Sequence, residues 1–478
     1  MRTAARTDKR RFFARTAPLR DRFDRRNRYY HHDLRAFYCF HIPPGSRVLE
    51  LGCGKGDLLA AVKPSCGVGV DFCERYIQEA RRRHPECRFI VANVEDLPEL
   101  EQTFDYVILS DLLENLDDVQ SVLSRLRPYC HPGSRLICNS FSNLWEPVLN
   151  AGEWLGLKMP TPAANWLSMA DIENLFYLSG FETVSRGYRM LFPRDAPLVS
   201  YLFNHLLAKA PFARKLCLTQ WLVARPQPSP PPDWETRYSV SIVIPARNEA
   251  GNIPGCFTRM PEMGKWTELI FVDGNSTDGT VEAIEAGIEQ HGQTWRRALL
   301  IPQGDGVGKG DAVRKGFAQA EGDILMILDS DLTMPPEDLP KFYEAIATGR
   351  GEFINGCRLV YPMKDEAMRT INYFGNKTFS LLFSWLLDQR IKDTLCGTKV
   401  LWREDYWKIA ANRGYFGGFD PFGDFDLIFG AAKLGRKIVD LPIRYRERVY
   451  GDTKISRWKH AALLFRMCGV AFKRLKLQ

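Results

Sequence analysis

Two aspartates separated by a single residue, Asp329 and Asp331, follow an apolar run at residues 324–328. Such a run is typical of a buried strand, so both carboxylates would stand at the end of that strand. Burying them there is costly unless a positive charge lies beside them. A Mg²⁺ or Mn²⁺ ion supplies that charge and also binds diphosphate oxygens. The spacing therefore predicts a metal and diphosphate site.

Two more acids, Glu249 and Asp273, follow other runs that read as strands. The first of these runs is rich in β-branched residues and is stopped by Pro245, which Ala246 follows. The carboxyl ends of neighbouring strands border a crevice at the sheet edge, and nucleotides bind in such places. We expect these acids to lie near the aspartate pair.

A glycine-rich loop at residues 304–310 contains Lys309. Its glycines lack the spacing of an ATPase phosphate loop, which argues against that class of enzyme. A flexible basic loop would attract a diphosphate group, and a solvated surface loop is the alternative.

The N-terminal half has its own glycine turn, Gly52, Gly54 and Gly56, which follows a predicted strand and precedes a predicted helix. Glycines at this spacing let the backbone turn tightly and approach a ligand closely. A second predicted strand ends at Asp71, whose carboxylate can accept two hydrogen bonds from a ribose diol. This order of elements indicates a nucleotide-type cofactor.

The elements that must position these residues alternate between short strands and amphipathic helices in both halves of the chain, the pattern of α/β domains. Five prolines among residues 226–232 predict a stiff, extended linker between the halves. We expect a basic N-terminal arm at 1–35, one α/β domain at 36–225, a linker at 226–237 and a second α/β domain at 238–478. A chain of 478 residues is long enough for two cores.

Residues 30–190 resemble the class I S-adenosylmethionine-dependent methyltransferases, which have a Rossmann-like fold. Besides the glycine turn, the likeness rests on residues 91–96, on the predicted strand 104–111 and on residues 126–137. The resemblance implies S-adenosylmethionine as the cofactor, with contacts from Glu50, Gly52, Gly54, Gly56, Asp71, Asn93, Val94 and Asp111.

One position departs from this family, because Glu114 is followed by Asn115 where many relatives carry a histidine. That change removes the obvious general base. Methyl transfer from a sulfonium can proceed by positioning alone, so an active methyltransferase is still expected. A non-catalytic domain that binds the cofactor or docks on a membrane is the alternative.

Residues 238–460 resemble family 2 glycosyltransferases of the GT-A fold, and among these the dolichol-phosphate or polyprenyl-phosphate sugar synthases. The resemblance implies that Pro245, Ala246, Glu249 and Asp273 hold the nucleoside of a UDP- or GDP-linked sugar, with Lys309 near the diphosphate. Asp329 and Asp331 would hold the metal, and transfer would invert the anomeric carbon. Thr333 stands at a third ligand position that is often a glutamine in this family.

Several residues indicate the acceptor of the second half. Arginine and lysine pair well with phosphate oxygens, and the residues placed for this role are Arg358, Arg369, Arg448 and Lys454. These cations suggest that the acceptor is a phosphate, and the resemblance implies polyprenyl phosphate as the favoured one. If the acceptor is instead a glycan or small-molecule hydroxyl, Asp424 is the candidate general base. A phosphate acceptor needs no base, because it is already anionic at neutral pH.

The charge is concentrated in residues 1–35, where twelve Lys or Arg face four Asp, a net of +8 that equals the net charge of the whole chain. A solvated helix is the expected state of this arm, and contact with a membrane surface is an alternative. Nucleic-acid binding is not expected.

Twelve scattered cysteines, without paired spacing, indicate reduced thiols and a cytoplasmic protein. The most apolar stretches, 198–208, 379–387 and 461–472, are too short to span a membrane. They are expected as buried core helices, with surface helices on the inner face of the membrane as the alternative.

Overall fold

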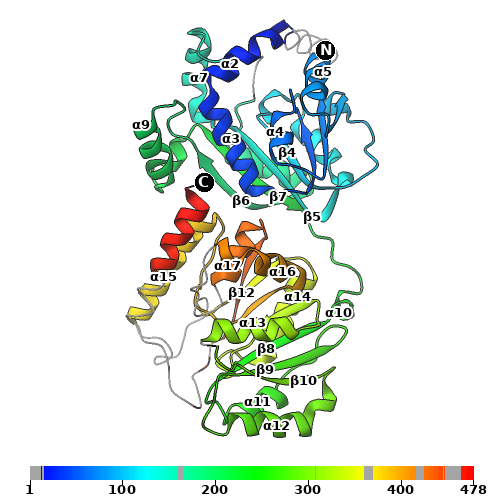
Figure 1. Cartoon of the computed structure of the whole chain (residues 1–478), viewed down its shortest axis with the longest axis vertical. Helices are drawn as coiled ribbons and strands as arrows, with labels where there is room; N and C mark the ends of the chain where they lie inside the picture. The colour runs from blue at the N-terminus through cyan, green and yellow to red at the C-terminus, as the bar shows by residue number, and fades with distance from the viewer. Residues whose placement is uncertain are drawn as a thin grey trace. The chain divides into compact units, whose positions relative to one another are not determined.

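The computed structural model describes residue 12 and residues 15–159, 165–306, 308–359, 370–415, 425–444, 446, 450 and 465–477. It divides into two compact units, Met1–Gln227 with Lys476–Gln478, and Pro228–Leu475. Each unit is built on a sheet of seven strands with helices on both faces (Figure 1). The expected class, two α/β domains, is confirmed.

The first sheet has the order β3-β2-β1-β4-β5-β7-β6. Its first five strands are parallel in the doubly wound order, and β7 joins them antiparallel to β5 and β6. The strands are β1 (Arg47–Leu51), β2 (Cys66–Asp71), β3 (Arg88–Val91), β4 (Phe104–Ser110), β5 (Cys130–Phe141), β6 (Phe181–Arg189) and β7 (Thr219–Pro226).

The helices of the first unit form two layers because successive strand residues point to opposite faces. Val48 packs with the helices that precede and follow β1 and β2, whereas Leu49 packs with those that follow β4 and β5. The helices are α2 (Arg20–Arg26), α3 (Arg28–His41), α4 (Asp57–Ala61), α5 (Glu74–Arg83), α6 (Val119–Arg125), α7 (Glu146–Trp154), α8 (Met169–Leu178) and α9 (Pro197–Tyr201).

Helix α3 crosses the expected boundary between arm and domain. Its Phe37 and Tyr38 are buried against β1 and β5, and Tyr30 is buried as well. An ion pair between Asp33 and Arg189 of β6, with an O···N distance of 2.6 Å, ties the same helix to the sheet. Residues 28–35 therefore pack on the first unit through Tyr30 and Asp33, while Arg28, His32 and Arg35 remain exposed.

The second sheet has the order β10-β9-β8-β11-β13-β12-β14. Strands β8 to β11 run parallel, β13 is antiparallel to both of its neighbours, and β12 and β14 are parallel. The strands are β8 (Val240–Ala246), β9 (Thr267–Asp273), β10 (Ala298–Pro302), β11 (Ile324–Ile327), β12 (Phe353–Cys357), β13 (Lys399–Trp402) and β14 (Ile438–Pro442).

Two layers of helices cover this second sheet. Ile242 faces the layer that contains α11, α12 and α14, and Val243 faces the layer of α13, α15, α16 and α17. The helices are α10 (Trp234–Arg237), α11 (Ile253–Thr258), α12 (Thr280–His291), α13 (Lys309–Gln319), α14 (Leu339–Ala347), α15 (Thr370–Leu387), α16 (Arg403–Ala411) and α17 (Phe425–Lys433).

The apolar stretches behave differently from one another. In α15, Phe379 and Phe383 are buried as expected. The prediction of a buried helix is wrong for residues 198–208, since Leu198 is 88% exposed there. Among the residues the structure describes, no helix is both long and apolar enough to cross a membrane.

Candidate functional site

The expected nucleotide-sugar residues converge at one edge of the second sheet. Pro245 and Ala246 are the last residues of β8, and Ala246 lies opposite Asp273, the last residue of β9. β11 runs parallel to β8 on its other side and leads into the aspartate pair. The hydroxyl of Ser330 donates to the Pro245 carbonyl at 3.0 Å, which fixes the turn between the two aspartates.

Asp273 and Glu249 are both buried at this edge. One oxygen of Asp273 accepts a hydrogen bond from the Ser276 backbone at 3.1 Å. Its other oxygen, Oδ1, is buried and finds no hydrogen-bond partner in the described part of the chain. Glu249 accepts from the Asn252 side chain at 2.7 Å. Since a buried acceptor without a donor is costly, Asp273 Oδ1 is suited to receive a donor from a ligand.

Lys309, the first residue of α13, places its ammonium 2.5 Å from Oδ1 of Asp329. Burial acts to raise the pKa of Asp329, but the charges of Lys309, Lys399 and Arg358 outweigh it and hold that pKa below its ordinary value. The carboxylate is therefore ionised at neutral pH. The counter-charge that the sequence argument assigned to a metal is, for Asp329, supplied by Lys309.

Asp331 is oriented by the residue at the expected third ligand position. Its Oδ1 accepts one hydrogen bond from the Thr333 backbone at 3.1 Å and another from the Thr333 hydroxyl at 2.8 Å. Thr333 is buried, so this arrangement is fixed by the local fold. Thr333 thus acts on the aspartate through hydrogen bonds.

The segment 392–399 reaches the aspartate pair from β13. A Cβ atom on Gly397 would overlap the Asp329 carboxylate and the Lys309 ammonium, so a larger residue here would displace that ion pair. In the same segment, Asp393 is fully buried. It accepts three hydrogen bonds from Arg358, from the backbone at 3.0 Å and from Nε and Nη2 at 2.8 and 2.9 Å.

Arg358 is thus committed in part to a buried ion pair, where the sequence suggested an acceptor phosphate. The pairing with Asp393 was not anticipated from the sequence. The other expected acceptor and catalytic residues, Arg369, Asp424, Arg448 and Lys454, lie outside the described residues.

The oxygen ligands at this edge fit a hard divalent cation that binds protein carboxylates and diphosphate oxygens at the same time. Within the described ranges, no group of three or more His, Cys, Asp or Glu is gathered that would hold a metal by itself. Asp329 and Asp331 offer two carboxylates, and Mg²⁺ or Mn²⁺ commonly binds through one or two carboxylates plus substrate phosphates.

In the first unit, the glycine turn adopts the backbone that its sequence predicts. Gly52, Gly54 and Gly56 all have positive φ, and a Cβ on Gly56 would overlap the Phe89 ring. Asp71 accepts from the Gly54 backbone at 2.9 Å and from the Cys73 backbone at 2.8 Å. The acid at the end of β2 therefore holds the turn in place.

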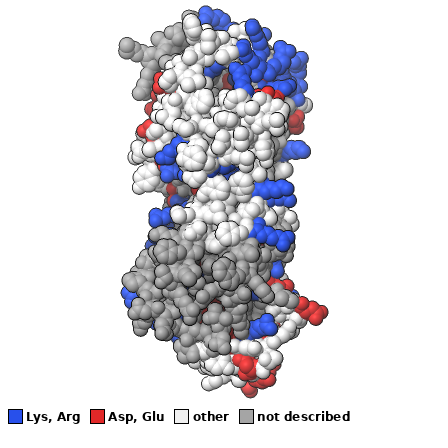
Figure 2. Space-filling model, turned by 90° about the vertical axis from the view of Figure 1, so that its left-hand side faces the viewer, with Lys and Arg blue, Asp and Glu red and all other residues white. Residues whose placement is uncertain are grey.

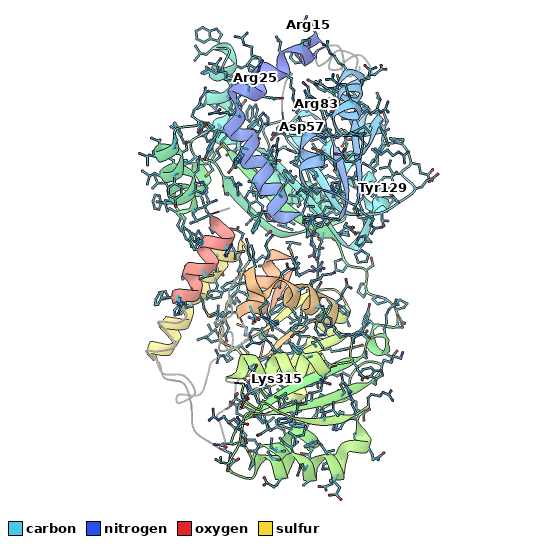
Figure 3. The ribbon with its side chains drawn as sticks, in the orientation of Figure 1. Arg15, Arg25, Asp57, Arg83, Tyr129 and Lys315 are labelled. Carbon is cyan, nitrogen blue, oxygen red and sulfur yellow. The ribbon has the colours of Figure 1, made fainter. Side chains whose placement is uncertain are left out.

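Glu50 lies at the same end of the first sheet and is buried. Its Oε2 has no hydrogen-bond partner among the residues described. Burial raises the pKa of Glu50 to about 8. Nearby, Asp57 at the start of α4 pairs with Arg83 at 3.5 Å (Figure 3). The orphaned oxygen and the glycine turn fit a polar cofactor such as S-adenosylmethionine.

Asn93 and Val94 follow β3, where Asn93 Oδ1 accepts from the Glu95 backbone at 3.1 Å and Val94 is buried. These two residues therefore lie at the carboxyl end of β3, which is the neighbour of β2 in the sheet.

Asp111 follows β4 and has a φ of +48°, a conformation that is uncommon for a residue with a side chain. Its oxygens accept hydrogen bonds from the Tyr30 hydroxyl at 2.7 Å and from Asn139 Nδ2 at 2.6 Å. Tyr30 belongs to α3, so a residue expected in a solvated arm lies beside an expected cofactor residue. No sequence motif marks Tyr30.

Glu114 lies close to Asp111 and is buried too. Its Oε1 accepts from the Phe141 backbone at 2.8 Å, and its Oε2 has no partner among described residues. Burial and the neighbouring Asp111 raise the pKa of Glu114. The site therefore contains a second partly unsatisfied carboxyl, next to Asn115, where the sequence lacks the histidine of many relatives.

Comparison with known proteins finds a family match for each half of the chain. Residues 23–186 match the family described as "Methyltransferase domain", and residues 241–410 match "Glycosyl transferase family 2". The chain is 42% identical to dolichol-phosphate mannosyltransferase of Saccharomyces cerevisiae over 111 residues, which are 22% of this chain and 40% of that protein. It is 25% identical over 239 residues to undecaprenyl-phosphate 4-deoxy-4-formamido-L-arabinose transferase of Edwardsiella ictaluri, covering 49% and 68%.

Two solved structures are also similar to parts of the chain. A SAM-dependent methyltransferase of Thermotoga maritima covers 45% of this chain and 99% of its own, at 17% identity and a TM-score of 0.36. Glucosyl-3-phosphoglycerate synthase of Mycobacterium tuberculosis, solved with Mn²⁺ and UDP, covers 50% and 81% at 19% identity and a TM-score of 0.38. The two family matches show that the chain contains an N-terminal methyltransferase domain, at residues 23–186, and a C-terminal domain of glycosyl transferase family 2, at residues 241–410.

Proposed function

We propose that the second domain transfers a sugar from a UDP- or GDP-linked donor to a polyprenyl phosphate, in a metal-dependent reaction that inverts the anomeric carbon. The observation that carries this proposal is the convergence of Asp273, Asp329 and Asp331 at the carboxyl ends of β9 and β11. Relatives named as dolichol-phosphate and undecaprenyl-phosphate sugar transferases support the choice of acceptor.

Different residues at this edge would bind different parts of the nucleotide-sugar donor. The unpartnered Oδ1 of Asp273, with Glu249, Pro245 and Ala246, would receive the nucleoside. Asp329 and Asp331 would hold Mg²⁺ or Mn²⁺, and the ion would stabilise the negative charge of the departing nucleoside diphosphate. Lys309 would contact the diphosphate from the side of the glycine-rich loop.

A phosphate acceptor would attack without a general base, since its oxygen is already ionised at neutral pH. The cations proposed for it are Arg358, Arg369, Arg448 and Lys454. The pairing of Arg358 with Asp393 points to a role in shaping this region as well as in attracting an anion. For a hydroxyl acceptor, Asp424 would be the base.

For the first domain we propose S-adenosylmethionine-dependent methyl transfer. The cofactor supplies a methyl group on a strongly electrophilic sulfonium, so orientation of the acceptor does most of the work. Glu50, Asp71 and Asp111 lie at the carboxyl ends of three adjacent strands and would hold the cofactor, together with Gly52, Gly54, Gly56, Asn93 and Val94. Glu114, with one oxygen unsatisfied, would face the acceptor.

Peripheral attachment to the inner face of a membrane is proposed from a surface of the first domain at residues 197–216. Its large apolar side chains are exposed, with Leu198 at 88% and Phe212 at 80%. Lys209, Arg214 and Lys215 lie in the same segment. Figure 2 shows broad uncharged areas on this side of the molecule, with both basic and acidic residues around them. An apolar surface with basic residues suits an anionic bilayer. The remaining exposed members are Val199, Tyr201, Leu202, Leu206 and Leu216.

A transfer assay tests the main proposal. Purified protein is incubated with labelled UDP- or GDP-sugars, Mn²⁺ and polyprenyl phosphate in detergent, with EDTA as a control. Label that enters the organic phase only with the metal present is expected. Product that forms equally well with EDTA would contradict the metal assignment, and label confined to water-soluble hydroxyl acceptors would favour the glycan alternative.

A further inference from the structure

Arg20, the first residue of α2, lies against the glycine turn of the methyltransferase domain. A Cβ built on Gly54 would lie 3.8 Å from Arg20 Nη2 and 3.9 Å from Cζ. The guanidinium also stands over the Tyr76 ring, with Cζ 5.5 Å from the ring centroid. Figure 3 shows α2, on which Arg25 is labelled, at the same end of this unit as Asp57 of α4. Residue 20 was expected in a solvated arm, yet it borders the cofactor site.

The charge of Arg20 reaches acids that end three different strands. Burial raises the pKa of Glu50, Asp71 and Asp111, and the Arg20 cation opposes that rise at each of them. These strands, β1, β2 and β4, are neighbours in the sheet. Arg20 therefore supplies positive charge to this group of acids, in addition to its contact with the glycine turn.

The position of Arg20 is set by the helix that follows it. α3 begins two residues after α2 ends and is held by the bond from Tyr30 to Asp111 and by the ion pair of Asp33 with Arg189. Arg20 itself is about one-third exposed and lies 3.7 Å from Asp24, one turn along its own helix. The side chain is thus partly accessible to a ligand while its helix is anchored.

S-adenosylmethionine carries one anionic group, its α-carboxylate, beside an ammonium and a sulfonium. The acids at this edge suit the ammonium and the ribose hydroxyls, whereas a carboxylate requires a cation or backbone donors. A guanidinium pairs with a carboxylate through two parallel hydrogen bonds, and the absence of a side chain at Gly54 leaves room for that group.

We propose that Arg20 binds the α-carboxylate of S-adenosylmethionine and that α2 covers the amino-acid end of the cofactor. The inference rests on the assignment of this cofactor to the domain. It gives the basic N-terminal segment a role in cofactor recognition.

Calorimetric titration of the full chain tests this with two ligands, S-adenosylhomocysteine and S-adenosyl-3-thiopropylamine, which differ only by the carboxylate. Arg20→Ala should weaken binding of the first about 10- to 100-fold, the range for hydrogen bonds between charged groups. It should change binding of the second less than threefold. Arg22→Ala, an exposed charge on the same helix, should leave both affinities unchanged.

The wild-type protein should bind the decarboxylated ligand as weakly as Arg20→Ala binds S-adenosylhomocysteine, because either change removes the same ion pair. Equal weakening of both ligands by Arg20→Ala would overturn the proposal, since it would mean that Arg20 only supports the fold. Unchanged affinity for S-adenosylhomocysteine would overturn it as well. If the wild-type protein binds neither ligand, the cofactor assignment fails together with the inference, while the glycosyltransferase proposal is untouched.

Discussion

The ammonium of Lys309 lies 2.5 Å from a carboxylate oxygen of Asp329, across the sheet edge where β11 ends and α13 begins. This pair links the glycine-rich loop to the aspartate motif, two features that are twenty residues apart in sequence. A diphosphate and its metal would bind beside this pair. Asp329 and Lys309 therefore mark the part of the second domain where substitutions should be most informative.

Asp331→Ala should lower sugar transfer by about 100- to 1000-fold, comparable to the loss of one group that stabilises a transition-state charge. Glu285→Ala, which removes an exposed carboxylate from α12, should transfer at the wild-type rate. Initial rates at saturating Mn²⁺ and the thermal midpoint of each variant give the measurement. Near-normal turnover of Asp331→Ala would refute the metal assignment.

Lys309→Ala should weaken binding of UDP or GDP roughly 10-fold, because a charge-assisted contact to the diphosphate contributes on the order of 1.5 kcal/mol. Binding of the free nucleoside, which lacks phosphates, should not change. Calorimetry with both ligands separates the two effects. Equal losses for nucleotide and nucleoside would show that Lys309 acts by holding the fold.

Gly397→Ala should abolish transfer, since its methyl group would overlap both Asp329 and Lys309. Gly414→Ala is the matched control, because nothing lies within 4 Å of a Cβ at that position. Activity and melting temperature of the two variants are compared. An active Gly397→Ala would mean that segment 392–399 does not approach the aspartates as closely as described.

The stability of the ligand-free protein should fall as pH rises from about 4.5 to about 8, owing to Glu50. Its pKa is raised from 4.5 to about 8 by burial, so in this window the folded protein keeps a proton that the unfolded chain has lost. Each such group contributes a slope of up to roughly 1.4 kcal/mol per pH unit. Glu50→Gln cannot titrate and should show a flatter profile in urea unfolding at pH 5, 6.5 and 8. Parallel profiles for the two proteins would contradict the burial of an ionisable Glu50.

The paired substitution Leu198→Ser with Phe212→Ser should reduce co-sedimentation with vesicles that contain anionic phosphatidylglycerol. Each exposed side chain would otherwise insert apolar surface, at about 25 cal/mol per Å² removed from water. Trp407→Ser, an exposed aromatic on α16 of the other unit, is the control. If the paired variant still binds the vesicles, the membrane contact lies outside residues 197–216. Concentration-dependent dimerisation of the wild type, lost in this variant, would show that the surface joins two copies instead.

The sequence predicted the strand-end acids correctly because a parallel sheet brings the carboxyl ends of its strands to one edge. Asp273 and Asp329 therefore come together even though 55 residues separate them in the chain. Local patterns of burial and turn residues were enough for that. The glycine turn at residues 52–56 was also predictable from a local pattern, the spacing of its glycines. In the structure each of these glycines has positive φ.

Contacts made by side chains across long sequence separations were not predictable. Tyr30 reaches Asp111, and Arg20 reaches Gly54, only because α2 and α3 fold back over the sheet. The high charge of residues 1–35 pointed to solvent, whereas the apolar residues interleaved in α3 place that helix in the core. The pairing of Arg358 with Asp393 was hidden likewise, because either residue alone looks like a surface charge.

The bond between Tyr30 and Asp111 sets a practical limit on how the two activities can be separated. A shortened protein that begins at residue 36 would lose Tyr30 and Asp33, leaving Asp111 and Arg189 without these partners in the interior. Such a fragment would make the methyl-transfer half look inert for reasons unrelated to its chemistry. A dissection of this chain should therefore keep α2 with the first domain. The cut belongs between Gln227 and Pro228, since the other junction between the units leaves only Lys476–Gln478 beyond it.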